Sequence, residues 1–257
     1  MHIQAVETRQ DLQAFIDLPY RLYRDDPNWI APLRGDQASQ YIPARNPMLD
    51  HCTYQLFLLK EGDAVIGRIS AFTDSLALEH WQQPIGLFGS FEASSAQGAG
   101  MLLQAAQDWL AARGMKTMRG PWSFASQEWG TVVEGFTPPP VILAPYNPPV
   151  YNDYLTAFGL QKAKDLLVYY MDTREAYAIP ERILTLTELV QKRYGVRIRP
   201  VNMKNLEEDV VTMVMLANQT ISDNWGFYPV TEAEGRSMAR DLKQIVNPDA
   251  LLIAEDP

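Results

Sequence analysis

The sequence predicts an α/β protein, in the wide sense that includes α+β, because segments with strand periodicity alternate with segments with helix periodicity. Of the 257 residues, 47% are hydrophobic and 21% are charged, which is typical of a globular protein with a sizeable core. At about 150 residues per domain, this length corresponds to about 1.7 domains. We therefore expect one complete unit, residues 1–173, and part of a second unit, residues 174–257.

Charge and composition exclude several classes of protein. The net charge of −9 argues against nucleic-acid binding, which needs clustered basic residues. The chain has no run of about 18 apolar residues that would span a membrane. Its first residues lack the basic and apolar regions of a signal peptide. The sequence therefore predicts a soluble, cytoplasmic protein with no nucleic-acid or membrane partner.

Cysteine and histidine give no sign of a metal site. Cys52 is the only cysteine, so an internal disulfide is excluded. The three histidines show no metal-ligand spacing with one another or with Cys52. His51 is its neighbour, but adjacent side chains on a strand point to opposite faces. We predict neither a metal centre nor a cysteine nucleophile.

The chain begins with a strand at Ile3–Glu7. Thr8 and Asp11 then form a capping pair at the start of a helix. Pro19 is expected to interrupt this helix or to start a second turn that runs through Arg24, because a proline inside a helix loses a hydrogen bond and clashes with the preceding turn. The stretch Asp25–Pro47 is rich in proline, and we expect it to be irregular with at most one short helix.

The central part predicts a hairpin of Tyr54–Lys60 and Ala64–Phe72, joined by a turn at Glu61–Asp63. A third strand, Ile85–Glu92, leads into the strongest helix pattern, Ala96–Arg113. After it, the sequence predicts three strands and a helix: Thr117–Arg119, a strand near Gly130–Val133, the helix Tyr151–Phe158 and a strand at Lys164–Met171.

The order of the predicted elements near the N-terminus recurs after residue 173. The predicted elements are a helix, a strand, two helices and a strand: Pro180–Tyr194, Val196–Val201, helices that open at Asn205 and at Thr231, and Ala250–Ala254. From Val196 onward, this order of strand, helix, helix and strand matches that of residues 3–60. We interpret it as a partial internal duplication.

The turn from the third strand into the long helix is the first candidate site. A helix N-terminus carries unpaired N–H groups and the positive end of the helix dipole, which together bind a pyrophosphate. Gly98 and Gly100 fit the second half of the acyl-coenzyme A signature Arg/Gln-x-x-Gly-x-Gly/Ala, with Ser95 in its first position. The predicted cofactor-binding residues are Phe91, Ser95, Gln97, Gly98, Ala99 and Gly100. The alternative is a capped core helix with small residues for close packing.

Three residues are candidates for catalysis. Glu92 closes the strand beside this turn and is a candidate general base for an amine, if burial raises its pKa. Tyr151 and Tyr154 are candidates to protonate a departing thiolate. The alternatives are an exposed acid at a strand end and tyrosines that only pack.

The loop Arg119–Gly130 mixes aromatic and hydrogen-bonding residues, as ligand pockets do, although a structural loop is an equal alternative. The chain has neither a Gly-x-Ser-x-Gly elbow nor a Walker loop, so serine hydrolases and P-loop NTPases are poor candidates.

Several sequence segments together resemble those of the bacterial tandem GCN5-related N-acetyltransferase (GNAT) domain proteins. The resemblance covers essentially the whole chain, and these segments carry it: Leu18–Trp29, Asn46-Pro47, Val65–Ala71, Gly89–Glu92, Trp109–Met115, Arg119–Pro121, Gly135-Phe136 and Pro145–Pro149. It implies a mixed, mainly antiparallel sheet flanked by helices. Acyl-coenzyme A (acyl-CoA) would bind where the fourth and fifth strands separate, with its pyrophosphate on the helix that starts near Ser95. In the relatives, the second unit continues past this chain's last strand, so that the unit here is incomplete.

Two functions follow from these observations. The first is an N-acyltransferase that moves an acyl group from acetyl-CoA or another acyl-CoA, or from an acyl carrier protein, to an amine. The second is a non-catalytic GNAT module that scaffolds or regulates a partner domain or binds a ligand. Ser95 and Leu155 favour the second function. The family usually has arginine or glutamine at the position of Ser95 and tyrosine at the position of Leu155. The sequence leaves a homodimer open.

Overall fold

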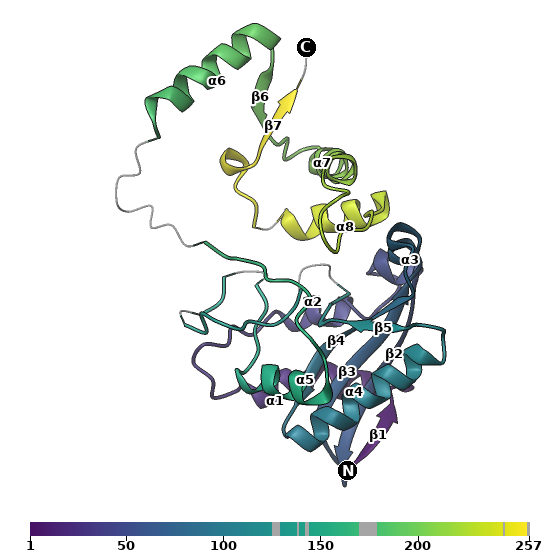
Figure 1. Ribbon diagram of the computed structural model, residues 1–257. Coiled ribbons are helices and arrows are strands. Elements are labelled where there is room, and N and C mark those ends of the chain that lie inside the picture. The colour runs from purple at the N-terminus through teal and green to yellow at the C-terminus, as the bar shows by residue number, and fades with distance from the viewer. Residues whose placement is uncertain (125–128, 138, 142–143, 170–178, 244, 256–257) are drawn as a thin grey trace. The chain divides into compact units, whose positions relative to one another are not determined.

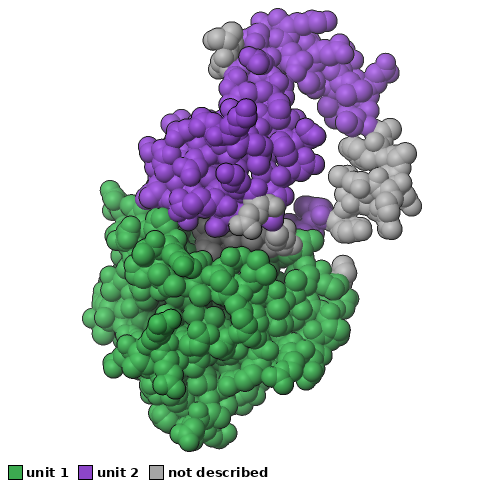
Figure 2. Space-filling view, turned by 180° about the vertical axis from the view of Figure 1, so that it is seen from behind, with its two compact units in different colours: residues 1–161, 221–229 green, residues 162–220, 230–257 purple. Residues whose placement is uncertain are grey.

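The computed structural model describes residues 1–124, 129–137, 139–141, 144–169, 179–243 and 245–255. Its contacts define two compact units, which Figure 2 colours separately. The first unit is Met1–Gln161 with Ile221–Pro229, and the second is Lys162–Thr220 with Val230–Pro257. The predicted boundary between residues 173 and 174 lies outside the described residues and stays a prediction.

The first unit is built on a five-stranded sheet with the strand order β1-β2-β3-β4-β5. The strands are β1 (His2–Ala5), β2 (Cys52–Glu61), β3 (Ala64–Asp74), β4 (Ile85–Ala93) and β5 (Thr117–Arg119). Neighbouring strands are antiparallel, except that β4 and β5 are parallel. The predicted fold class, a mixed and mainly antiparallel sheet flanked by helices, is confirmed.

Helices cover both faces of this sheet (Figure 1). They are α1 (Arg9–Leu22), α2 (Arg34–Ser39), α3 (Ser75–Trp81), α4 (Ala96–Ala111) and α5 (Val150–Phe158), with a 3-10 turn at Pro47–Asp50. Strand side chains alternate between the two faces, so Leu58 packs in the cluster of α1 and Leu59 packs in the cluster of α4 and α5. Helix α3 is not among the elements that the sequence predicts. Its start is capped by the side chain of Asp74.

Helix α1 is not interrupted at Pro19, the first of the two predicted outcomes, but continues through it to Leu22. A proline in a helix has no N–H for the carbonyl four residues earlier, which here is that of Phe15. The guanidinium of Arg68 donates a hydrogen bond of 2.8 Å from Nη1 to this carbonyl. A tertiary contact therefore replaces the missing helical bond.

Strand β4 contains a bulge. Ser70 pairs with Gly89 and Arg68 pairs with Glu92, so two steps along β3 correspond to three steps along β4. Ser90 lies inside the bulge with a φ of 48°, in the left-handed region, and its hydroxyl lies 2.8 Å from that of Tyr41. Because directly paired residues share a face, the extra residue places Glu92 on the face of Arg68.

The strands β4 and β5 separate soon after they begin. Their pairing joins Ile85–Leu87 to Thr117–Arg119, and the N–H of Trp122 then donates to the carbonyl of Phe88 at 2.8 Å. A Cβ at Gly89 would lie 1.8 Å from the carbonyl oxygen of Trp122, so only glycine permits this close approach. Among the described residues, no strand flanks β4 on this side beyond Gly89.

Two predicted strands are not found. Gly130–Val133 forms no strand, because side-chain amides bind the backbone of Val132 in place of a neighbouring strand. Asn147 Oδ1 accepts from its N–H at 2.7 Å, and Asn152 Nδ2 donates to its carbonyl at 2.8 Å. The described part of Lys164–Met171, residues 164–169, is also irregular, since no described segment pairs with it.

The second unit contains α6 (Glu181–Tyr194), β6 (Arg197–Pro200), α7 (Leu206–Thr220), α8 (Glu232–Leu242), a 3-10 turn at Pro248–Ala250, and β7 (Leu252–Glu255). Strands β6 and β7 pair antiparallel. Glu255 follows its partner Arg197 by 58 positions, and Lys60 follows its partner His2 by the same 58 positions. That this unit is an incomplete copy of the first stays a prediction. No described helix of either unit has the length and apolar character needed to cross a bilayer.

Candidate active site

A buried carboxylate lies at the end of β4 that has no neighbouring strand on one side. Glu92 is 8% exposed, and its Oε2 accepts hydrogen bonds from the hydroxyls of Tyr23 and Tyr151. The bond from Tyr151 is 2.9 Å long. Tyr23 directly follows α1, whereas Tyr151 lies on α5. The carboxylate is therefore reached by one tyrosine from the helical layer on each face of the sheet.

The hydroxyl of Tyr151 also occupies part of the gap beside β4. It accepts the backbone N–H of Ala93 at 3.0 Å, and it lies 3.3 Å from the hydroxyl of Tyr23. An N–H at a strand edge normally pairs with a neighbouring strand. Here a side chain satisfies it, at the point where β4 and β5 have separated.

Arg68 balances the charge of the carboxylate. Its Nη2 lies 3.6 Å from Oε1 of Glu92, and both side chains are almost fully buried. A buried charge is costly unless it is paired and hydrogen-bonded. The two tyrosine donors and this guanidinium together allow Glu92 to be buried as a carboxylate.

Both tyrosines are held in the protonated form. Burial, together with the neighbouring Glu92 carboxylate, raises the pKa of Tyr23 and of Tyr151 well above its ordinary value. Each phenol can therefore donate a hydrogen bond while Glu92 is charged. Loss of a proton from Tyr151 becomes easier only when Glu92 itself takes one up.

Of the three predicted catalytic residues, the structure brings Glu92 and Tyr151 together but not Tyr154. The ring of Tyr154 lies 6.0 Å from that of Tyr151 and packs in the cluster between α4 and the sheet. Tyr146 lies beside the group, since its hydroxyl donates to Asp26 and its ring packs edge-on against Tyr23.

The predicted cofactor residues divide into two sets. Ser95 caps α4 and accepts the N–H of Gly98 at 3.1 Å. A Cβ on Gly98 would lie 2.6 Å from Leu59, so this glycine is needed for close packing. Ala99 is fully buried, and Phe91 packs at 5.2 Å against the ring of Tyr151. These residues cap the helix or pack in the core, and their part in cofactor binding stays a prediction.

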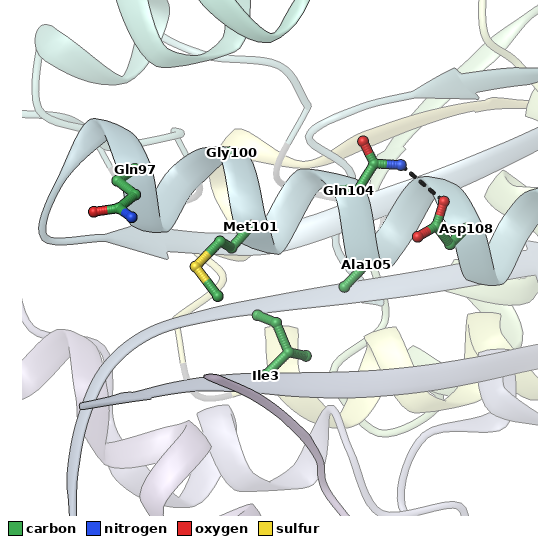
Figure 3. A pocket seen from close by; sticks show the side chains of 7 residues that line it. All are labelled: Ile3, Gln97, Gly100, Met101, Gln104, Ala105 and Asp108. Atoms are coloured by element: carbon green, nitrogen blue, oxygen red, sulfur yellow. Dashed lines mark hydrogen bonds between the residues drawn. The ribbon is translucent and has the colours of Figure 1, made fainter. Parts of the chain in front are cut away.

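Gln97 and Gly100, in contrast, lie outside the core. They line a shallow, open depression on the β1 side of α4, where Met101 and Ala105 face Ile3 (Figure 3). Because β4 is three strands away from β1, this depression is separate from the Glu92 cluster. A Cβ on Gly100 would meet nothing within 4 Å, so packing does not require this glycine.

His51 and Cys52 do not point to opposite faces, as predicted, but both reach Asp74. The Nδ1 of His51 lies 3.0 Å from Oδ1 of Asp74, and the Sγ of Cys52 lies 3.7 Å from its Oδ2. The prediction was wrong because His51 ends the 3-10 turn and is not part of β2. Burial raises the pKa of the Cys52 thiol to about 12, which does not suit a nucleophile.

Sequence reasoning missed two members of the cluster, Tyr23 and Arg68. Arg68 lies directly opposite Glu92 because of the bulge in β4, and regular pairing of the predicted strands would have placed Phe91 there. Tyr23 is 69 positions away from Glu92 in the sequence, and no local pattern marks it.

The chain is similar to two curated bacterial proteins. One is named "bacterial ceramide synthase", from Caulobacter vibrioides, and is 37% identical over 251 residues, which are 94% of this chain. The other is protein YghO of Escherichia coli, 35% identical over 249 residues, which are 96% of this chain. The chain spans 63% of the length of each relative. No protein-family model matches it.

Two solved structures align with part of the chain. A probable acetyltransferase is 14% identical, covers 67% of this chain and 97% of its own, and has a TM-score of 0.39. An acetyltransferase from Trypanosoma brucei is 12% identical, covers 66% of this chain and 99% of its own, and has a TM-score of 0.37. The fold class stated above rests on the strand order and pairing alone.

Proposed function

We propose that the first unit carries the site of an N-acyltransferase, which joins an acyl group from acyl-CoA or an acyl carrier protein to an amine. One observation carries this proposal: Glu92 is a buried carboxylate that contacts two protonated phenols where β4 has lost its neighbouring strand. Base and acid groups thus adjoin a stretch of strand edge along which an extended thioester substrate could lie.

The proposed reaction forms a C–N bond and breaks a C–S bond. The amine nitrogen attacks the thioester carbonyl carbon, and Glu92 takes the proton that the nitrogen loses. Tyr151 gives its proton to the departing thiolate and receives the proton held by Glu92, whose Oε2 lies 2.9 Å from the phenol oxygen. The products are an amide and a free thiol, and the cluster returns to its starting state.

The start of α4 supports binding of the cosubstrate pyrophosphate only in part. Ser95 already uses the N–H of Gly98, so the first helical N–H groups, of Ala96 and Gln97, would contact the phosphates. The helix dipole adds to their attraction.

For the acceptor, we propose a long-chain amine. A relative that is 37% identical is named a ceramide synthase, and a ceramide is the amide of a fatty acid with a long-chain amino alcohol. This name supports a long-chain amino alcohol and a fatty acyl thioester as the first substrates to test.

The direct test is to measure thiol release from acyl-CoA in the presence of the amine. Glu92→Gln keeps the size of the side chain but removes the base, so we expect turnover to fall by about a hundredfold or more. Glu79→Gln, at an exposed glutamate of α3, is the matched control and should leave turnover unchanged. Equal turnover in wild type and Glu92→Gln would show that Glu92 is not the base.

The second candidate is a non-catalytic ligand-binding module. Tyr151 favours it, because its hydroxyl occupies the N–H of Ala93 within the gap. Isothermal titration with acetyl-CoA and a long-chain acyl-CoA separates the two functions. Binding without thiol release supports the module, whereas no heat from folded protein at high micromolar ligand contradicts cosubstrate binding altogether.

A further inference from the structure

Arg119 lies at the end of β5, where this strand separates from β4, and its guanidinium is held by two tryptophans. The Cζ atom lies 4.7 Å from the ring centre of Trp81 and 5.1 Å from that of Trp225. Such cation–π contacts fix the position of a guanidinium but use none of its five N–H groups to bind an oxygen atom.

The charge of Arg119 has no partner among the described residues. The guanidiniums of Arg68, Arg199 and Arg236 each face a carboxylate within 4 Å, but no hydrogen bond or ion pair joins the guanidinium of Arg119 to a described residue. Partial burial lowers the pKa of Arg119, and no acid among the described residues raises it again.

The surroundings of Arg119 are built by three separate parts of the first unit. Trp81 ends α3, Arg119 ends β5, and Trp225 belongs to the segment Ile221–Pro229. The indole N–H of Trp81 donates to the carbonyl of Phe227 at 2.7 Å, which ties that segment to α3. The guanidinium is thus positioned in advance, while Trp225 remains 38% exposed.

We propose that Arg119 binds an oxyanion, namely the carboxylate or phosphate group of a small ligand. A guanidinium offers paired N–H donors that match two oxygens of such a group. The site is distinct from the proposed acyl-transfer site. Arg119 pairs with Leu87, which precedes Glu92 by five residues, or about 17 Å of extended strand. Its test therefore does not depend on acyl transfer.

The experiment titrates the full chain with inorganic phosphate and, separately, with acetate, at an ionic strength held constant with sodium chloride. Tryptophan fluorescence reports on all six tryptophans, among them Trp81 and Trp225 beside Arg119, and the thermal unfolding midpoint reports on binding to the folded state. We expect at least one anion to give a saturable response in the millimolar range, with a rise in the unfolding midpoint. Saturation by phosphate or by acetate tells which oxyanion the site prefers.

Arg119→Gln should weaken this response by about tenfold or more. Arg113→Gln is the matched control, because Arg113 also lies over a tryptophan, Trp109, at 3.6 Å but is exposed just after the end of α4, and it should bind as wild type does. Equal responses of wild type and Arg119→Gln would overturn the proposal. So would the absence of any saturable response in the folded wild type, which needs no variant to be measured.

Discussion

The guanidinium of Arg68 donates to the carbonyl of Phe15, the oxygen that Pro19 leaves without a helical partner, and also lies 3.6 Å from Glu92. One side chain thus connects the proline of α1 to the buried acid of β4. The same guanidinium thus supplies a hydrogen-bond donor to the unpaired carbonyl of the helix and a positive charge to the carboxylate of the candidate site. Substitution of Arg68 should therefore affect both elements.

We expect Arg68→Met to lower the free energy of unfolding by about 3–5 kcal/mol, because it leaves Glu92 without its cationic partner in a buried place. Urea unfolding followed by circular dichroism measures this change. Arg34→Met is the control, since the pair of Arg34 with Asp17 is exposed and should contribute at most about 1 kcal/mol. Similar values for both variants would contradict the role given to Arg68.

Tyr23 and Tyr151 should differ in kinetics but not much in stability. Each phenol donates to a buried carboxylate, so we expect Tyr23→Phe and Tyr151→Phe each to cost about 1.5–3 kcal/mol. Only Tyr151→Phe should also lower kcat strongly with a smaller change in KM, because it is the proposed proton donor. An equal loss of kcat in both variants would assign the two tyrosines the same role.

The glycines of α4 offer a matched pair. Gly98→Ala should destabilise the protein, because the new Cβ would lie 2.6 Å from Leu59, whereas Gly100→Ala has open space and should stabilise α4 by about 0.5–1 kcal/mol. Thermal unfolding distinguishes them. If Gly100→Ala also abolishes cosubstrate binding, the backbone at Gly100 contacts that ligand, as the signature predicts.

The Cys52 thiol should be unreactive in the folded protein. With its pKa raised to about 12, its thiolate fraction at pH 8 is about a thousandfold lower than in an unfolded chain. A disulfide reagent such as DTNB should therefore label the native protein slowly and the urea-unfolded protein rapidly. Fast labelling of the native protein would mean that Cys52 is an activated nucleophile after all.

Stability should fall in strong base. The folded-state pKa values of Tyr23 and Tyr151 are raised, so above about pH 10 the unfolded chain loses these protons first. Their stabilising effect is complete below that pH and is lost as pH rises, with a slope of up to about 1.4 kcal/mol per pH unit for each tyrosine. Urea unfolding at several pH values should show a shallower slope in Tyr23→Phe, and an unchanged slope would contradict the assignment.

Local patterns predicted most of the elements well, because the signals for them lie within a few residues. The capping pair of Thr8 and Asp11 is present, as is the short strand Thr117–Arg119. The two strands that failed, near residue 130 and after residue 163, have strand-like composition but no partner among the described residues. Pairing is a property of the fold, and composition does not report it.

The candidate site was predicted only in part for the same reason. Glu92 and Tyr151 could be proposed from the type of residue and its place at the end of an element. Tyr23 and Arg68 reach the site only through tertiary contacts. The sequence around Arg119 does not show that its guanidinium has no acidic partner among the described residues. Chemistry that depends on distant residues needs the structure.

The bulge at Ser90 determines on which face of the sheet Glu92 lies. If β4 kept Ser90 but paired without the bulge, Phe91 would lie opposite Arg68, and Glu92 would lie on the other face of the sheet. Deletion of Ser90 would instead remove the bulge and leave Glu92 opposite Arg68, because Glu92 would then follow Gly89 by two steps, just as Arg68 precedes Ser70 by two steps. Two chains with the same residues in this strand can therefore differ in whether the acid faces the arginine, according to whether the bulge forms.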